Sequence, residues 1–115
     1  MILRAAAALP SSRGLRGITY STFYALMAAT GMRIGESLAL DRNDVDLGSG
    51  VLTIRHAKFG KSRLLPLHTT TAKALASYAL QRDRVLGRAS PPPFFISDSG
   101  KRITEWGARY NFARI

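Results

Sequence analysis

Residues 30–68 read TGMRIGESLALDRNDVDLGSGVLTIRHAKFGKSRLLPLH and contain the change of periodicity that decides the fold. Gly31 is placed to end the apolar helical run of residues 18–30 as a C-cap glycine. A short second helix follows, with Ile34, Leu38 and Leu40 directed inward, and the Asp- and Asn-rich DRND then turns the chain. After residues 48–50 the apolar residues recur with period two, which predicts a β-hairpin.

The predicted hairpin has one apolar face. Residues 51–56 alternate, with Leu52, Ile54 and His56 on one face and Val51, Thr53 and Arg55 on the other. The returning strand is RLLPLH, residues 63–68, and Gly60 supplies the flexible position that the intervening loop needs. Pro66 cannot donate a backbone hydrogen bond, so we expect this strand at the edge of a sheet.

Helices are predicted on both sides of the hairpin. Residues 1–9 are expected to form a short helix and residues 10–17 a turn-forming linker; the apolar stripe of the helix at 18–30 is Tyr20, Phe23, Tyr24 and Met27. After the hairpin, a helix is expected to begin with Thr69 or Thr70 as N-cap and to end at Gly87, with Leu75, Tyr78, Ala79 and Leu86 toward the core.

The last quarter of the chain completes the predicted fold. FFIS, residues 94–97, reads as a short buried strand or extended segment, and residues 98–102 read as a turn. Thr104 is expected to cap a final helix that carries Trp106 and Phe112, with Tyr110 in the core. These elements predict one domain with an α+β, mostly helical fold in which short helices surround a small antiparallel hairpin or sheet.

Composition points to a polyanionic partner. The chain has 115 residues, a formal net charge of +10 and a pI near 11.1, and most of the basic excess lies after residue 57. No cysteine is present, which excludes a disulfide framework, a thiolate zinc site and a thiol nucleophile. No stretch approaches the roughly 20 apolar residues of a membrane span, and residues 1–10 do not read as a secretory signal, so we expect a cytoplasmic location.

Two clusters of charged residues are candidates for a site. Arg33 and Glu36 are either an ordinary i, i+3 ion pair or a phosphate grip, because an arginine buried at a helix junction needs an anion to hold it. The hairpin carries Arg55, Lys58, Lys61 and Arg63 without an acid. This is either a solvated basic turn or a hairpin that reaches a phosphate.

The two clusters together resemble a known family. The order TG-x-R-x-x-E, helix, acidic turn, strand, K-x-G-K-x-R-x-x-P-L hairpin and helix is similar to the first half of the catalytic domain of tyrosine recombinases, the phage integrase family. The resemblance implies that double-stranded DNA is the partner and that a tyrosine attacks the scissile phosphate without a metal or cofactor. It also implies that Arg33 binds the non-bridging phosphate oxygens, Lys58 protonates the leaving 5′-oxygen and Glu36 supports the arginine. Arg55, Lys61 and Arg63 are then expected to contact the DNA backbone.

The chain departs from this family pattern in its second half. Neither His56 nor His68 begins an H-x-x-R box, and none of the four tyrosines follows such a box. We therefore expect residues 1–115 to be a truncated catalytic domain, without the amino-terminal helical domain and the tyrosine-bearing half, that cannot cleave DNA alone. This leaves open whether the chain is an enzyme.

Two alternative functions are considered. The first is a non-catalytic DNA-binding or decoy protein on a recombinase scaffold, with full-length recombinase protomers as a further candidate partner, because family members work as oligomers on DNA. The second is a generic basic fold that binds RNA or DNA without a dedicated function, or a decayed gene product with an incomplete core. A bacterial, phage or mobile-element origin is expected from the resemblance.

Overall fold

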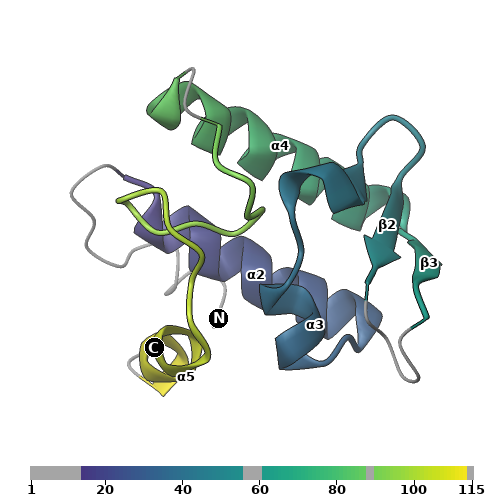
Figure 1. Ribbon diagram of the computed structural model, residues 1–115, viewed down its shortest axis with the longest axis horizontal. Coiled ribbons are helices and arrows are strands. Elements are labelled where there is room, and N and C mark those ends of the chain that lie inside the picture. Colours follow the sequence, from purple (N-terminus) through teal and green to yellow (C-terminus); the bar gives the residue numbers. More distant parts are fainter. Residues whose placement is uncertain (1–13, 56–60, 88–89, 114–115) are drawn as a thin grey trace.

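Helix α2 (Arg16–Thr30) runs through the middle of the molecule, and the other elements pack around it (Figure 1). In the computed structural model, residues 14–55, 61–87 and 90–113 are described. The elements that follow are α3 (Ile34–Leu38), the 3₁₀ helix η1 (Arg42–Asp44), strands β1 (Val45–Asp46), β2 (Val51–Ile54) and β3 (Arg63–Pro66), α4 (Thr69–Leu86) and α5 (Glu105–Ala113). The predicted fold class is confirmed: helices surround a small antiparallel sheet. The helix predicted at residues 1–9 lies outside the described residues.

Helix α2 supplies one wall of the core, as its stripe predicts. Tyr20, Phe23 and Tyr24 are buried, and Met27 packs against them. The helix begins at Arg16, two residues earlier than expected. Gly31 ends it with φ of 70°, and its N–H donates to the carbonyl of Met27 at 2.9 Å. A left-handed residue at this position is what a glycine C-cap provides.

The sheet has three antiparallel strands in the order β1-β2-β3. Leu52 and Ile54 are buried, as the alternation predicts, and Pro66 lies in the edge strand. Strand β1 was not predicted, because two residues are too few to show a period of two. It forms by pairing with β2, where Val45 lies opposite Leu52.

Helix α4 lies across α2 and covers the core from the other side (Figure 1). Leu75, Tyr78 and Ala79 are buried as expected, whereas Leu86 is only partly buried. The predicted threonine N-cap is wrong. His68 holds that position, and its Nδ1 accepts a hydrogen bond from the N–H of Thr70 at 3.4 Å, because the imidazole nitrogen can replace the usual side-chain oxygen.

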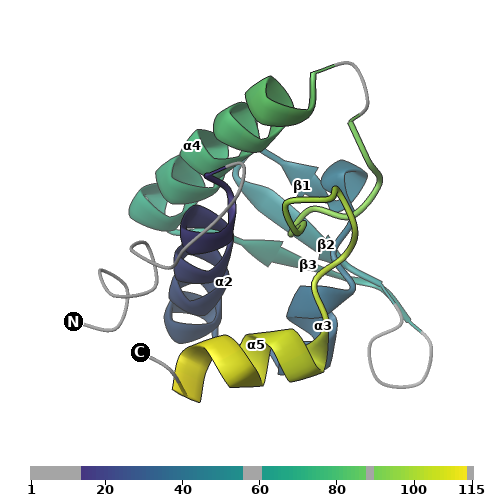
Figure 2. The same ribbon diagram turned by 90° about the vertical axis from the view of Figure 1, so that its left-hand side faces the viewer.

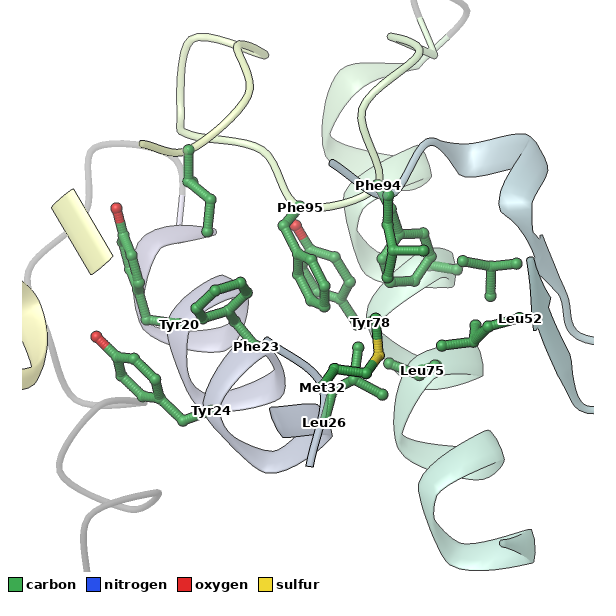
Figure 3. Close-up of a cluster of buried hydrophobic side chains, with 14 of the residues drawn as sticks. Tyr20, Phe23, Tyr24, Leu26, Met32, Leu52, Leu75, Tyr78, Phe94 and Phe95 are labelled. Atoms are coloured by element: carbon green, nitrogen blue, oxygen red, sulfur yellow. The ribbon is translucent and has the colours of Figure 1, made fainter. Parts of the chain in front are cut away.

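Residues 94–96 form a bent segment, not the predicted strand or extended segment: residues 94 and 95 are bends and Ile96 forms an isolated β-bridge with Arg102. Phe94 and Phe95 of this segment enter between α2 and α4 (Figure 3). Phe95 contacts Phe23 edge-on, with ring centroids 5.2 Å apart, and stacks on Tyr78 at 5.5 Å. The Tyr78 hydroxyl lies 2.9 Å from Thr19 Oγ1 and accepts from the N–H of Ile96. The segment predicted as a short strand or extended piece is thus held by aromatic packing and by one buried hydroxyl network.

Arg82 is a fully buried charge that the helical pattern did not reveal. Its Nη2 donates to the carbonyls of Pro91 and Pro93 at 2.7 and 2.8 Å, and its Nη1 is paired with Asp83. The carbonyls of a proline-rich segment lack ladder partners, and a guanidinium can satisfy several of them at once. Arg82 therefore fixes the path of residues 90–93 into the core.

Helix α5 packs beneath α2, with its first turn toward α3 (Figure 2). Thr104 caps it as predicted, since Thr104 Oγ1 accepts from the N–H of Gly107 at 2.9 Å. The expectation that Tyr110 is a core residue is wrong. Tyr110 is 40% exposed and stacks on the exposed Trp106, because the helix turns this face away from α2. In the parts of the chain that the structure describes, no helix combines the length and apolar character of a membrane span.

Candidate nucleic-acid interface

Arg33 stands at the N-cap of α3 with its side chain exposed. The prediction that Arg33 is buried at the junction between helices is wrong. Met32 is buried and Ile34 and Leu38 are partly buried, whereas the extended backbone at Arg33, with φ of −71° and ψ of 150°, carries its side chain outward. The guanidinium therefore needs no internal anion to offset a burial cost.

Glu36 joins the helix to the hairpin. Its Oε1 accepts from the backbone N–H of Arg33 at 3.1 Å, and its two oxygens bind Arg63 Nη1 and Nη2 at 3.0 and 3.4 Å. The hydrogen bond from the Arg33 N–H is the main cause that lowers the pKa of Glu36, and Arg63 lowers it further. Glu36 thus supports Arg33 through its backbone, and the forked ion pair goes to Arg63 on β3.

Arg55 follows β2 directly and is held by acidic residues of the segment after α3. Its Nε donates to Asp44 Oδ2 and its Nη2 to Asp41 Oδ2, both at 2.9 Å, with a further bond from Nη2 to the carbonyl of Ala39. The hydrogen bond with Asp44 is the main cause that raises the pKa of Arg55. Two of the hairpin cations, Arg55 and Arg63, therefore have acidic partners, which lie in α3 and in η1 with its N-cap residue Asp41.

Lys61 is exposed next to Arg63, whereas Lys58 and His56 lie outside the described residues. The structure thus brings Arg33, Glu36 and Arg63 together and engages Arg55 in ion pairs within the fold.

Three residues of this surface were missed by sequence reasoning: Asp41, Asp44 and Arg102. Arg102 donates to the carbonyls of Leu38 and Leu40 and pairs with Asp41. The sequence predicts DRND only as a turn and Arg102 only as part of another turn, with Arg102 lying 61 residues after Asp41. The acidic turn after α3 was the available signal, because it is the nearest source of counter-charge for the basic hairpin. A hollow of about 470 Å³ lies beside these side chains, lined by Gly35, Leu38, Ala39, Asp41, Arg55 and Arg102.

The described residues contain no group of three or more His, Cys, Asp or Glu side chains that could hold a metal ion. Metal-free chemistry remains a prediction of the resemblance. The site that the geometry offers is cationic, with carboxylates that orient arginines and an exposed arginine at a helix start.

Comparison with known proteins identifies the family. The sequence model of the phage integrase family matches residues 3–115. The chain belongs to the phage integrase family. It is 45% identical over 101 residues to y4rE of Sinorhizobium fredii (strain NBRC 101917 / NGR234), a protein named as an integrase/recombinase, and the match covers 88% of this chain. It is 36% identical over 85 residues to tyrosine recombinase XerC of Roseiflexus sp. (strain RS-1), over 71% of this chain.

This phage integrase family member spans only part of these relatives, 33% of y4rE and 27% of the Roseiflexus XerC. Among solved structures, the crystal structure of XerA recombinase matches with a TM-score of 0.69 at 24% identity, covering 98% of this chain and 38% of that chain. At this level of identity, the match to the XerA recombinase structure shows similarity of the fold.

Three of the four tyrosines of this family member are buried: Tyr20, Tyr24 and Tyr78. Burial raises the pKa of Tyr20 and of Tyr78, and burial together with Tyr20 raises the pKa of Tyr24 to about 12. The Tyr24 hydroxyl also donates to the carbonyl of Ala108 at 2.6 Å. Each of these effects favours the neutral phenol, whereas a nucleophilic tyrosine must lose its proton. Tyr110 is the exposed tyrosine, and its ring is stacked on Trp106.

Proposed function

We propose that this chain is the phosphate-gripping part of a tyrosine recombinase catalytic domain that acts in site-specific recombination of double-stranded DNA. In this proposal residues 1–115 form one partial catalytic domain. Arg33 binds the non-bridging oxygens of the scissile phosphate, Lys58 protonates the leaving 5′-oxygen, and Lys61 and Arg63 contact the backbone nearby. Because the bacterial relatives carry recombinase names, we place the protein with the bacterial genome, in the cytoplasm.

One observation supports this proposal above the others: Glu36 binds both the backbone of Arg33 and the guanidinium of Arg63. A single carboxylate thereby links the two basic motifs, which are far apart in sequence, on one surface. A preorganised cation beside a phosphate stabilises the charge that builds on its oxygens in the transition state, which is usually the largest catalytic contribution. No proton transfer or metal is needed for that part of the reaction.

In the proposed chemistry, the phenolate oxygen of an incoming tyrosine, whose proton has passed to solvent, forms the phosphotyrosyl bond while the bond to the 5′-oxygen breaks, and Lys58 gives that oxygen its proton. The chain's own tyrosines are not proposed for the attack, because three are buried with raised pKa values and the fourth is stacked on a tryptophan. We therefore expect the chain alone to bind duplex DNA without forming a covalent product.

The first test measures binding of the 115-residue chain to a short fluorescent duplex over a NaCl series. Arg33→Ala should weaken binding and reduce the slope of log Kd against log salt by about 0.9, the value for one lost phosphate contact. Lys73→Ala removes an equal charge from the exposed face of α4 and serves as the matched control, for which we expect a smaller change. Equal effects of the two variants would show that Arg33 has no special role.

A second test concerns cleavage. The chain is incubated with duplex DNA and then boiled in detergent, and covalent products are resolved on a gel. We expect none. A protein–DNA adduct that survives boiling would show that one of the four tyrosines can act as nucleophile after all.

A further inference from the structure

The two carboxylates of the acidic turn after α3, Asp41 and Asp44, are bound mainly by arginines. Asp41 is 28% exposed at its side chain and pairs with both Arg55 and Arg102, and Asp44 is 11% exposed and pairs with Arg55. Asp44 Oδ2 also accepts from the backbone N–H of Asp41 at 2.8 Å. Arg55 therefore bridges the two carboxylates, Arg102 binds Asp41, and the Asp41 N–H binds Asp44, so the two side chains belong to one hydrogen-bonded network.

This network connects three separate segments of the chain. Arg55 is the first residue after β2, and Arg102 belongs to the segment that leads into α5. Arg102 also binds the carbonyls of Leu38 and Leu40, and the N–H of Arg42 donates to the carbonyl of Pro92 at 2.6 Å. The acidic turn that binds the hairpin is thus itself anchored by Arg102 and by the bond to the carbonyl of Pro92.

The opposite strand of the hairpin is held by the same stretch of chain. Arg63 lies opposite Ile54 in the β2–β3 ladder and is bound by Glu36, which also caps the N–H of Arg33. Carboxylates of residues 36–44 therefore grip both strands at the end of the ladder next to Lys61. Figure 1 shows α3 and the two strands at the same side of the molecule.

Three of the seven acidic residues of this chain bind the hairpin. The sequence has seven Asp and Glu residues against 17 Lys and Arg, and Glu36, Asp41 and Asp44 all go to the two arginines of the hairpin. Isolated surface ion pairs contribute little to stability. A shared network holds β2 and β3 against α3, whose N-cap is the exposed Arg33. Such a network can determine where Arg33 lies relative to the cations of the hairpin.

We propose that Asp41 and Asp44 are positioning residues: anchored by Arg102, they hold the β2–β3 hairpin through Arg55 so that Lys61 and Arg33 contact the same DNA backbone together. This inference rests on the proposed function. Arg55 then acts as a strut within the protein and is not itself a principal DNA contact. The two carboxylates touch no phosphate, and their effect on DNA passes through the placement of the hairpin.

The test uses the 115-residue chain, a short duplex and the isosteric double variant Asp41→Asn with Asp44→Asn. Lys61→Ala should weaken DNA binding about fivefold in the wild-type background, as expected for loss of one ionic contact, and almost not at all in the double-Asn background. Arg33→Ala should keep its full effect in both backgrounds, because α3 is unchanged. The single variant Asp41→Glu keeps the charge at this position. In this background, Lys61→Ala should weaken DNA binding more than it does in the double-Asn background.

Amide hydrogen exchange gives a second readout that needs no DNA. In the double-Asn variant the amides of β2 and β3 should exchange about tenfold faster while those of α4 stay unchanged. If circular dichroism shows that the double variant does not fold, both measurements are repeated on the single variant Asp41→Asn, which keeps the hydrogen bond from the Asp41 N–H to Asp44 Oδ2.

The outcomes separate the inference from the proposed function. An undiminished Lys61→Ala effect in the double-Asn background, or unchanged exchange in the hairpin, would overturn the positioning role. Tighter DNA binding with both alanine effects intact would show that the carboxylates only neutralise charge, which also overturns it. A wild-type chain that binds no DNA would instead refute the proposed function, and the exchange measurement would still decide whether the carboxylates fix the hairpin.

Discussion

At the scale of single residues, Glu36 makes the stability of the protein depend on pH. Its pKa is lowered chiefly by the bond from the Arg33 N–H, so its charged form is favoured in the folded state. The resulting stability is present above the unfolded pKa of about 4.3 and is lost as pH falls through the lower folded pKa. At about pH 7 we expect Glu36→Gln to lower the free energy of unfolding by about 1 kcal/mol.

Urea denaturation of both proteins at neutral and acidic pH checks this prediction. The difference between wild type and Glu36→Gln should disappear once the pH lies below the folded pKa, because both side chains are then neutral. The control is Glu105→Gln, whose ion pair with Arg109 is largely exposed and should contribute little at any pH. A wild-type advantage that persists in acid would contradict the assignment of the effect to the charge of Glu36.

Residues were predicted from the sequence with uneven success, and the reason is physical. The stripe of Tyr20, Phe23 and Tyr24 follows from helical periodicity, which is local information. The partners of Arg82 and Asp41 lie far away in the sequence or in irregular segments, so no periodic pattern indicates them. Arg33 was expected to be buried because its neighbours are apolar, whereas its side-chain direction depends on the backbone angles at one N-cap residue.

At the scale of elements, the packing of α5 against α2 depends on Gly107. A Cβ added at Gly107 would lie 2.8 Å from Tyr20 Oη and 3.1 Å from Thr104 Oγ1. We expect Gly107→Ala to displace α5 and to lower the free energy of unfolding by about 2 kcal/mol, because overpacking outweighs the gain in helix propensity. Thermal unfolding followed by circular dichroism measures the change.

Gly35→Ala in α3 is the matched control for that substitution. A Cβ at Gly35 meets nothing within 4 Å, so the better helix propensity of alanine should leave stability unchanged or raise it by about 0.5 kcal/mol. If Gly107→Ala were as stable as Gly35→Ala, α5 would have room to shift on α2 at little cost. That result would contradict the tight contact between the two helices.

The elements themselves were mostly predictable, and the exceptions share a cause. Helices α2 and α4, the hairpin and the Thr104 cap follow from periodicity and capping residues. Strand β1 exists only because Val45 pairs with Leu52, and the exposed face of α5 with Trp106 and Tyr110 depends on how the helix is turned against α2. Both are consequences of tertiary packing, which a single segment of sequence does not contain.

At the scale of the whole molecule, we expect salt screening of the net charge of +10 to act on folding and on the proposed DNA binding in opposite directions. Cations in excess repel one another in the compact state, and salt screens that repulsion beyond a distance of about 10 Å at 0.1 M. The same salt competes with the protein for DNA phosphates and weakens binding. A rise in salt concentration should therefore raise the stability of the protein and lower its affinity for DNA.

We expect the Tm to rise by about 3 °C between about 20 mM and about 200 mM NaCl, which corresponds to less than about 1 kcal/mol, while the Kd for a short duplex increases at least tenfold. Differential scanning calorimetry and fluorescence anisotropy measure the two quantities on the same samples. The control replaces the exposed Lys73 and Arg84 of α4 by glutamate, which lowers the positive excess away from the candidate interface and should flatten the salt dependence of the Tm. A Tm that falls with salt would mean that the ion pairs around Glu36, Asp41 and Asp44 outweigh the repulsion among the remaining cations. The charge network would then be a principal source of stability as well as a positioning device.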